Sequence, residues 1–326
     1  MTYNDAFLRT LHAALSQKLG DWSFTPAASL SLLNISENAT YLAQEGERRL
    51  ILRVHRPGYH ATHEITGELA WISALRAEGI VETPAPIAGS DGKLLHALDH
   101  EGAERMVAAF DFVPGRSPEP HEDLVDWFRE LGMITARLHV HARAWPRPAD
   151  FARKSWTVDT ILGRKGYWGD WRRGLGLDDA GRALLERAQD AIAAELARYG
   201  SGEDRFGLIH GDLRLANLLV DGPRMRVIDF DDCGFSWFMY DFASAVSFFE
   251  HEPVVPALAD SWAEGYRRVA ALSAEDKAML PALVLMRRML LVAWVASHAE
   301  TPTAQEMGAA YTEGGLRLAD QFLSSR

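Results

Sequence analysis

The segment GLIHGDLRLANLLV, from Gly207 to Val220, places His, Asp and Asn in the frame H-x-D-x-x-x-x-N. Apolar residues flank this frame on both sides, which is typical of a polar loop between two short buried strands. A second apolar run follows and ends in VIDFDDCG, so Asp229 leaves a strand-like run as Asp212 does upstream. The sequence therefore predicts two carboxylates and the Asn217 amide at the ends of neighbouring strands.

Side chains of this kind suit a hard divalent cation. Mg²⁺ prefers oxygen ligands and usually binds through few protein groups together with phosphates. A carboxylate that is not a metal ligand can accept or orient the proton of a hydroxyl group, and phosphoryl transfer uses this division of roles. The alternative assigns Asp212 and Asp229 to turn or helix-cap chemistry, and the joint pattern disfavours it.

The first 110 residues alternate strand-like runs around helices. Residues 1–20 carry apolar side chains at helical spacing. The runs ATYLAQE and RRLILRV are separated by GE, which predicts a hairpin. ATHEITGELAWISALRAEG predicts a helix that ends at Gly79, and TPAPIAG, LLHAL and RMVAAFDFV predict further strands.

The pattern changes after VPGRSPEP, whose prolines and glycine indicate a linker. Beyond it, apolar stripes at helical spacing predict long helices, and Ser273 to Asp276 has the form of a capping box. The sequence therefore predicts an α+β protein with a β-rich lobe over residues 1–110 and a mainly helical lobe over residues 111–326.

Composition excludes several classes of partner. The chain has 326 residues and a formal net charge of −11, which gives a nucleic-acid surface no electrostatic support. Its single cysteine, Cys233, suits a reducing compartment. The N-terminus lacks the pattern of a signal peptide. Arg287 and Arg288 stand at the centre of AMLPALVLMRRMLLVAWVA, which favours a buried helix over a membrane span. We expect a cytoplasmic protein without nucleic-acid or membrane partners; its oligomeric state is not predicted.

HGDLRLAN followed by IDFDD resembles the catalytic core of the aminoglycoside phosphotransferase-like kinases. The resemblance covers nearly the whole chain: LNISENATYLA is similar to the nucleotide-covering loop, LILRVHRPG to the phosphate-contacting strand, and ELAWISALRAEG to the helix of the first lobe. It implies a protein-kinase-like bilobal fold and a phosphotransferase that uses ATP and Mg²⁺. The homoserine kinase and stress-response Ser/Thr kinase branches are also similar.

The resemblance implies a role for each matching residue of the second lobe. Asp212 matches the catalytic aspartate that receives or orients the acceptor hydroxyl. Asn217 and Asp229 match the residues that hold the metal. Asp231 and Asp232 add carboxylates where protein kinases have glycine, and their roles stay open.

The first lobe departs from the protein-kinase pattern at two places. Arg53 stands where those enzymes hold a lysine that contacts phosphates; arginine keeps the charge and can bind phosphate with two donors. Glu68 is its expected partner, with Glu64, one helical turn earlier, as the alternative. SENATY replaces the glycine-rich loop, so Ser36 and Asn38 are expected to contact the nucleotide.

Other residues are assigned to support or to the acceptor site. His210 is expected to support the catalytic loop, Asp241 to accept hydrogen bonds from the backbone of that loop, and His139 to pack in the core. Aromatic and acidic side chains could bind an amine-bearing alcohol by cation–π contacts and ion pairing, or could be packing residues. The candidates are Trp156, Asp159, Trp168, Trp171, Glu250 and Glu252.

Three functions remain open at this point. The first is a kinase that transfers the γ-phosphoryl group of ATP to the hydroxyl of a small, amine-bearing molecule. The second is a bacterial protein kinase of the stress-response type, whose acceptor is a Ser or Thr side chain. The third is a nucleotide-binding protein without catalysis, which the filled catalytic positions disfavour.

Overall fold

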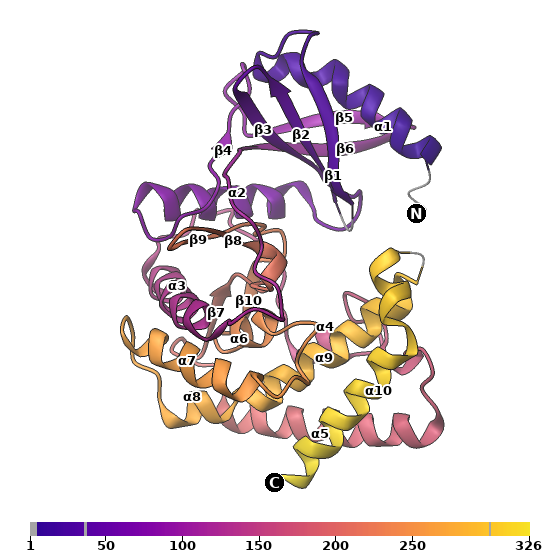
Figure 1. Cartoon of the computed structure of the whole chain (residues 1–326), viewed down its shortest axis with the longest axis vertical. Helices are drawn as coiled ribbons and strands as arrows, with labels where there is room; N and C mark the ends of the chain where they lie inside the picture. The colour runs from indigo at the N-terminus through magenta and orange to yellow at the C-terminus, as the bar shows by residue number, and fades with distance from the viewer. Residues whose placement is uncertain (1–4, 36–37, 300) are drawn as a thin grey trace. The chain divides into compact units, whose positions relative to one another are not determined.

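The computed structural model describes residues 5–35, 38–299 and 301–326. The chain divides into two units, residues 1–115 with 147–152 and residues 116–146 with 153–326. The first is built on an antiparallel sheet and the second is mainly helical, in agreement with the predicted α+β class (Figure 1). The expected boundary at residue 110 falls inside the last strand of the sheet, β6 (Ala103–Asp111), because that strand pairs with three others and belongs with them.

The sheet of the first unit has the order β1-β2-β3-β6-β4, with β5 also paired to β6. All of these pairs are antiparallel. The predicted hairpin is present, since β2 and β3 are joined by Gly46 and Glu47 alone and Gly46 has a positive φ of 59°. The remaining bounds are β1 Ser29–Ile35, β2 Ala39–Glu45, β3 Arg48–Val54, β4 Pro86–Ile87 and β5 Leu95–His100.

The amphipathic N-terminal helix supplies the core of this unit. α1 (Asp5–Lys18) lies beside the sheet (Figure 1). Apolar side chains of α1 and of the short 3₁₀ helix η1 (Leu19–Trp22) share one buried cluster with those of the strands. Leu11 and Leu15 are fully buried there beside Tyr41 and Leu52. The other helix, α2 (Thr62–Ala77), ends two residues before Gly79, close to the predicted end.

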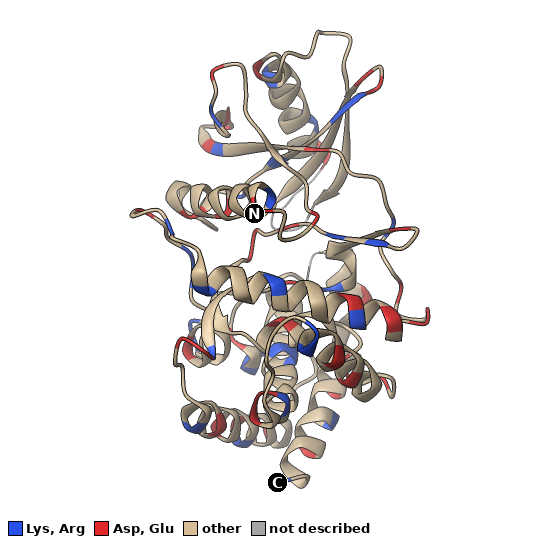
Figure 2. Cartoon of the chain, turned by 90° about the vertical axis from the view of Figure 1, so that its left-hand side faces the viewer, with Lys and Arg blue, Asp and Glu red and all other residues tan. Residues whose placement is uncertain are grey.

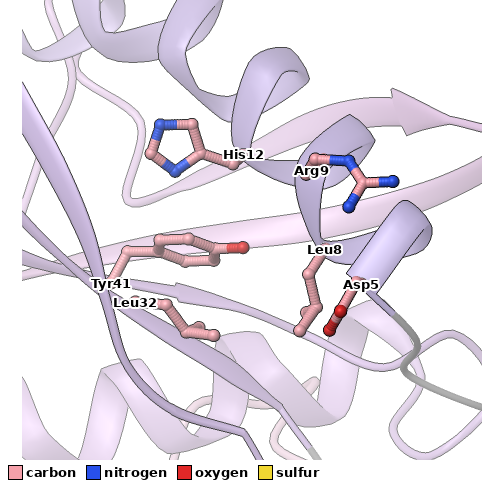
Figure 3. Close-up of a pocket in the computed structure, with 6 residues that line it drawn as sticks. All are labelled: Asp5, Leu8, Arg9, His12, Leu32 and Tyr41. Carbon is pink, nitrogen blue, oxygen red and sulfur yellow. The ribbon is translucent and has the colours of Figure 1, made fainter.

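A pocket of about 390 Å³ lies between α1 and strands β1 and β2. Figure 3 shows the residues that line it. Leu8, Leu32 and the ring of Tyr41 give it an apolar lining, and Asp5, Arg9 and His12 complete the wall. Of the predicted nucleotide-binding residues that the structure describes, none lines this pocket. It is therefore a feature of the packing of α1 on the sheet.

Helices dominate the second unit, and two small two-stranded sheets lie among them. One sheet pairs β7 with β10 and the other pairs β8 with β9; β7, β8 and β9 fall in the two predicted strand-like pieces, whereas β10 was not predicted. The bounds are α3 Val125–Ala144, α4 Val158–Leu162, η2 Trp171–Arg173, α5 Asp179–Tyr199, β7 Phe206–Ile209, η3 Leu215–Asn217, β8 Leu218–Asp221, β9 Arg224–Val227, β10 Gly234–Trp237, α6 Tyr240–Ala245, α7 Val255–Arg267, α8 Ala274–Ala278, α9 Leu280–Ser297 and α10 Pro302–Ser324.

The apolar stretch around Arg287 forms α9, the central helix of this unit. By length and composition the helical region Ala274–Ser297 could cross a membrane, but 83% of its most apolar window is buried inside the fold. A capping box precedes it as predicted, because Ser273 Oγ accepts from Asp276 N and Ser273 N donates to the Asp276 carboxylate. The burial of α9 identifies it as a core helix.

Charged residues are distributed along both units. Figure 2 shows Lys and Arg interspersed with Asp and Glu along the ribbon. Opposite charges form pairs at several surface positions, such as Arg268 with Glu264 and Lys277 with Asp260, both at 2.5 Å. Exposed pairs of this kind contribute little to stability, so the fold depends on its apolar cores.

Two glycines allow α3 and α7 to pack closely. A Cβ atom at Gly132 would meet the backbone oxygen of Trp262, and one at Gly265 would meet the backbone oxygen of Arg129. Each glycine lies on one helix and faces the backbone of the other, so the contact is reciprocal. Backbone atoms cannot move aside as a flexible side chain can, and these helices therefore require glycine at both positions.

We expect Gly265→Ala to lower the free energy of unfolding by about 2–3 kcal/mol, because forcing a methyl group into a packed site costs more than the helix propensity of alanine returns. Urea unfolding would measure the change. Gly20→Ala is the control, since no atom lies within 4 Å of the added Cβ there. Equal unfolding free energies for the two variants would contradict the close-packing argument.

Candidate active site

The H-x-D-x-x-x-x-N frame forms the loop between β7 and β8. β7 ends at Ile209 and the 3₁₀ turn η3 ends at Asn217, so the polar residues lie between two buried strands as predicted. Gly211 has a positive φ of 79°, and a Cβ there would lie 2.7 Å from the backbone oxygen of Asp232. Glycine is thus required between His210 and Asp212, both because of this conformation and because of the close backbone contact.

The carboxylate of Asp241, on α6, holds the backbone of this loop. Its Oδ1 accepts from Gly211 N at 2.7 Å and its Oδ2 accepts from His210 N at 3.2 Å. Ser244, one turn later, accepts from Leu213 N at 2.9 Å. Hydrogen bonds to a buried charged acceptor are stronger than neutral ones, so α6 fixes the start of the loop. The expected contact between Asp241 and the loop backbone is confirmed.

His139, on α3, is a supporting residue that sequence reasoning assigned to packing. Its Nε2 lies 3.0 Å from Asp241 Oδ2 and its Nδ1 lies 3.1 Å from the Tyr266 hydroxyl. A carboxylate can only accept, so Nε2 carries the proton and Nδ1 accepts from Tyr266, whose pKa burial raises to about 12. Burial also lowers the pKa of His139, more than Asp241 raises it. His139 is therefore a neutral donor to Asp241.

His210 supports the loop from within. Its Nδ1 accepts from Asp212 N at 3.2 Å and its Nε2 donates to Ile228 O at 3.2 Å. The ring centroid lies 4.4 Å from that of Phe230. Burial lowers the pKa of His210, which keeps the ring neutral and preserves the acceptor at Nδ1. The expected supporting role is confirmed by these contacts.

Three side chains donate to the carboxylate of Asp212. Asn217 Nδ2 lies 2.7 Å from Oδ2, Arg214 Nε lies 3.2 Å from Oδ2, and Arg287 Nη2 lies 2.5 Å from Oδ1. Burial raises the pKa of Asp212, but the positive charges of Arg214 and Arg287 outweigh burial, so the pKa lies below its ordinary value. Asp212 is therefore a carboxylate at neutral pH, with both oxygens in fixed positions.

Asn217 and Asp229 lie at one end of the β8–β9 hairpin. Leu218 pairs with Val227 in the antiparallel register, and Ile228 N donates to Asn217 O at 2.9 Å. Ile228 and Asp229, which follow Val227, are therefore brought close to Asn217, which precedes Leu218. Asn217 uses its NH₂ group on Asp212, which leaves its Oδ1 as the atom that could ligate a cation. Asp229 is exposed and has a φ of 63°, a conformation that Asp adopts more readily than most residues.

The two acids after Asp229, Asp231 and Asp232, have backbone oxygens that accept hydrogen bonds from other side chains. Arg153 Nη2 donates to the backbone oxygen of Asp231, and Arg153 Nε donates to that of Cys233 at 2.6 Å. Trp156 Nε1 donates to the backbone oxygen of Asp232 at 2.9 Å. The carbonyls of this loop are thus held by the segment that precedes α4.

In the first unit, Arg53 pairs with Glu68. The guanidinium of Arg53 on β3 donates to Glu68 Oε1 on α2, while Glu64 Oε2 accepts from Ala61 N at 2.8 Å at the start of that helix. The pairing left open between Glu64 and Glu68 is therefore decided in favour of Glu68. Asn38 Oδ1 accepts from Arg56 N at 3.1 Å. Ser36 lies outside the described residues.

The aromatic candidates for an amine site are packing residues. Trp156, Trp168 and Trp171 are buried to 2%, 7% and 0% exposure. The cations nearest two of these rings belong to the chain itself, with Arg287 Cζ 5.0 Å from the Trp168 ring centroid and Arg172 Cζ 4.2 Å from that of Trp171. Burial and these contacts favour packing over amine binding, two interpretations that the sequence alone does not separate.

The acidic candidates separate into two groups. Glu250 is fully enclosed, with Arg288 Nη1 at 2.7 Å from one carboxylate oxygen and the Tyr311 hydroxyl at 2.9 Å from the other. Its charge is therefore neutralised within the fold. Asp159 and Glu252 are exposed, and Glu252 lies 3.6 Å from His251.

Because burial depresses the pKa of His139, its protonation should couple to unfolding. As pH decreases, His139 of the unfolded chain binds a proton near pH 6.5, whereas His139 of the folded protein binds one only at lower pH. The free energy of unfolding should therefore fall as pH decreases below about 6.5. One such group contributes a slope of up to about 1.4 kcal/mol per pH unit. Urea unfolding of the protein and of His139→Gln from about pH 7.5 to about pH 5.5 should show a shallower decline in the variant. Identical slopes would show that His139 titrates alike in both states.

Comparisons with known proteins agree with this geometry. The sequence profile of the phosphotransferase enzyme family matches residues 31–272. A homoserine kinase from Gluconobacter oxydans is 28% identical over 255 residues, which cover 76% of this chain and 75% of that protein. The structure of a microcompartment-associated aminopropanol kinase is 46% identical, with a TM-score of 0.89, and the match covers 96% of this chain and 98% of that one.

The fold is also that of a more distant kinase. The amicoumacin kinase hAmiN, in complex with AMP-PNP, Ca²⁺ and Ami, has a TM-score of 0.79 at 20% identity, and the match covers 98% of this chain and 96% of that one. The family match extends over most of the chain and includes the catalytic loop, Asn217 and Asp229. The chain therefore belongs to the phosphotransferase enzyme family and is a small-molecule kinase with the protein-kinase-like fold.

Proposed function

We propose that this kinase transfers the γ-phosphoryl group of ATP to the hydroxyl of a small amino alcohol. The observation that carries the proposal is the Asp212 carboxylate, which is held ionised and oriented by Arg287, Arg214 and Asn217 on the loop that precedes β8. A residue held in this way suits the loose transition state of phosphoryl transfer, in which positioning matters more than a strong base.

The proposed reaction forms one bond and breaks one bond. The acceptor oxygen forms a bond to the γ-phosphorus while the bond from that phosphorus to the β,γ-bridging oxygen breaks, which yields ADP and a phosphate monoester. Asp212 orients the hydroxyl and accepts its proton as the new bond forms. Its lowered pKa makes it a weak base, so the proton moves once the hydroxyl oxygen has begun to bond to phosphorus.

Asn217 and Asp229 are the residues that would hold Mg²⁺. They offer an amide oxygen and a carboxylate at one end of the same hairpin, and oxygen donors of this type are the ligands that Mg²⁺ prefers. The ion, when bound, supplies charge neutralisation to the phosphate oxygens. In the first unit Arg53, oriented by Glu68, would donate to phosphate oxygens, and Asn38, whose Oδ1 accepts from Arg56 N, would contact the nucleotide.

The amine-bearing acceptor is supported by the similarity to the aminopropanol kinase, which is 46% identical over 96% of this chain. The homoserine kinase relative is named for another amine-bearing alcohol. Because Glu250 and the three tryptophans are used within the fold, the acceptor ammonium would be met by exposed carboxylates such as Asp159 and Glu252. The recognition of the amine is then electrostatic and solvent-accessible, which allows small acceptors of different length.

The test is a panel of acceptors offered to the purified protein with Mg²⁺ and labelled ATP. The panel contains aminopropanol, homoserine, propanol without the amine, and a Ser/Thr-containing protein substrate. We expect label on amino alcohols, and a value of kcat/KM about two- to fivefold lower for propanol, since an exposed ion pair contributes about 0.5–1 kcal/mol. Asp212→Ala should lower kcat by about 10³-fold or more while nucleotide affinity is kept. Label only on protein side chains, or equal use of propanol, would contradict the proposed acceptor.

The metal-binding role of Asp229 has a separate readout. We expect Asp229→Asn to weaken Mg²⁺-dependent binding of a non-hydrolysable ATP analogue by about tenfold or more, because a neutral amide is a poorer ligand for a hard cation than a carboxylate. Titration calorimetry across a series of Mg²⁺ concentrations would measure this. Asp221→Asn, an exposed position at the other end of the same hairpin, is the matched control, and its Mg²⁺ dependence should equal that of the unchanged protein. The same Mg²⁺ dependence in all three proteins would exclude Asp229 as a ligand.

A further inference from the structure

Two adjacent arginines of α9 are buried within the second unit. Arg287 is 2% exposed and Arg288 is 1% exposed. A buried cation is costly unless it is paired and hydrogen-bonded. The two side chains satisfy this requirement with different partners, since Arg287 pairs with Asp212 and Arg288 pairs with Glu250. One arginine therefore contacts the carboxylate assigned to the reaction, and its neighbour does not.

All three nitrogens of the Arg287 guanidinium are engaged. Nη2 donates to Asp212 Oδ1 at 2.5 Å, Nη1 lies 3.3 Å from Gly211 O, and Nε donates to Ser247 Oγ at 3.0 Å. The ring of Trp168 lies beside the group, with its centroid 5.0 Å from Cζ. A planar group held at three nitrogens cannot rotate without losing several contacts at once. Arg287 is therefore a fixed donor to the catalytic loop.

The segment that supplies Ser247 has an unusual backbone. Phe248, the next residue, has a φ of 79°, a left-handed conformation that an aromatic residue seldom adopts. Such conformations persist where the surrounding structure imposes them, and they are frequent near functional sites. Phe248 directly follows Ser247, whose hydroxyl accepts from Arg287 Nε, so the strained backbone lies next to this contact.

The two oxygens of Asp212 differ in their surroundings. Oδ1 is bound by Arg287, whose side chain is 2% exposed. Oδ2 is bound by Asn217 and by Arg214, whose side chain is 29% exposed. A partly exposed side chain with a 3.2 Å contact, such as that of Arg214, is displaced more easily than a buried one held at three nitrogens, such as that of Arg287. Oδ2 is therefore the oxygen that an incoming hydroxyl can reach.

We propose that Arg287 is a positioning residue for phosphoryl transfer. It fixes the Asp212 carboxylate through Oδ1 and so presents Oδ2 to the acceptor hydroxyl. Arg287 itself is buried and acts through Asp212 rather than on the substrates. The inference rests on the proposed function, because it assigns Asp212 to the acceptor hydroxyl. A displacement of about 1 Å in a catalytic group can reduce the rate by about 10²-fold, which sets the size of the expected effect.

The experiment compares Arg287→Lys with Arg288→Lys, since each change keeps the charge at neighbouring buried positions of one helix. Steady-state kinetics with MgATP and the best acceptor of the panel would give kcat and both KM values, and thermal unfolding would show that each variant is folded. We expect kcat to fall about 10²-fold in Arg287→Lys, with both KM values changed by less than about threefold, because lysine cannot reproduce the three-point contact. Arg288→Lys should keep kcat within about threefold of the unchanged protein.

A rescue measurement separates positioning from structural support. Guanidinium added at a non-denaturing concentration should raise kcat of Arg287→Ala and leave kcat of Arg288→Ala unchanged, because only the first variant lacks a donor to Asp212. Equal kcat losses in both lysine variants, a loss confined to the acceptor KM, or no rescue in a folded Arg287→Ala would overturn the proposal.

The proposed function can fail separately. If the unchanged protein phosphorylates no acceptor of the panel, the proposed function falls, and the lysine variants are compared by ATP hydrolysis with water as the acceptor. The same loss in Arg287→Lys alone would then still support the positioning role, whereas hydrolysis at the unchanged rate would overturn it.

Discussion

The buried carboxylate of Asp241 is the contact on which the active-site loop depends. It accepts from two successive backbone amides, at His210 and Gly211, and from the His139 ring. Since the conformation of Gly211 turns the chain just before Asp212, an anchor at these amides sets the direction in which Asp212 leaves the loop. Burial keeps His139 neutral and Tyr266 protonated. The Tyr266 hydroxyl can therefore donate to His139 Nδ1, and His139 Nε2 can donate to Asp241. The loop is positioned by neutral donors around one charge.

A second layer of contacts places the Asp212 side chain itself. Asn217 bonds both to the backbone oxygen of Asp212 and to its carboxylate, and Arg287 contacts the other oxygen. These contacts oppose the desolvation that would otherwise favour the protonated acid. The backbone anchor at Asp241 and the Arg287 contact come from different helices, α6 and α9, which pack against each other. The packing of α6 against α9 therefore helps to fix the orientation of the Asp212 carboxylate.

The interior of the second unit uses charges and aromatic rings that could have served a ligand. Arg288 neutralises Glu250, and Arg287 and Arg172 lie beside tryptophan rings. Sequence reasoning could not separate packing from recognition at these positions, because the types of side chain that bind an ammonium group also bind an arginine of the chain. Membership of a family of small-molecule kinases therefore restricts the chemical class of the acceptor more than the side chains of this region do.

The sequence by itself determined the β-rich character of the first unit and the helical character of the second, the polar loop between two short strands, and the placement of Asp212, Asn217 and Asp229 on that loop and the hairpin that follows it. These features are local, because a spacing of a few residues places side chains on one loop or one hairpin. Tertiary structure alone decided that Arg287, 75 residues after Asp212, faces its carboxylate, and that His139, 102 residues before Asp241, completes the anchor. Whether a buried charge is compensated depends on the partner that another helix brings to it, and a residue's own neighbours in sequence do not reveal that partner.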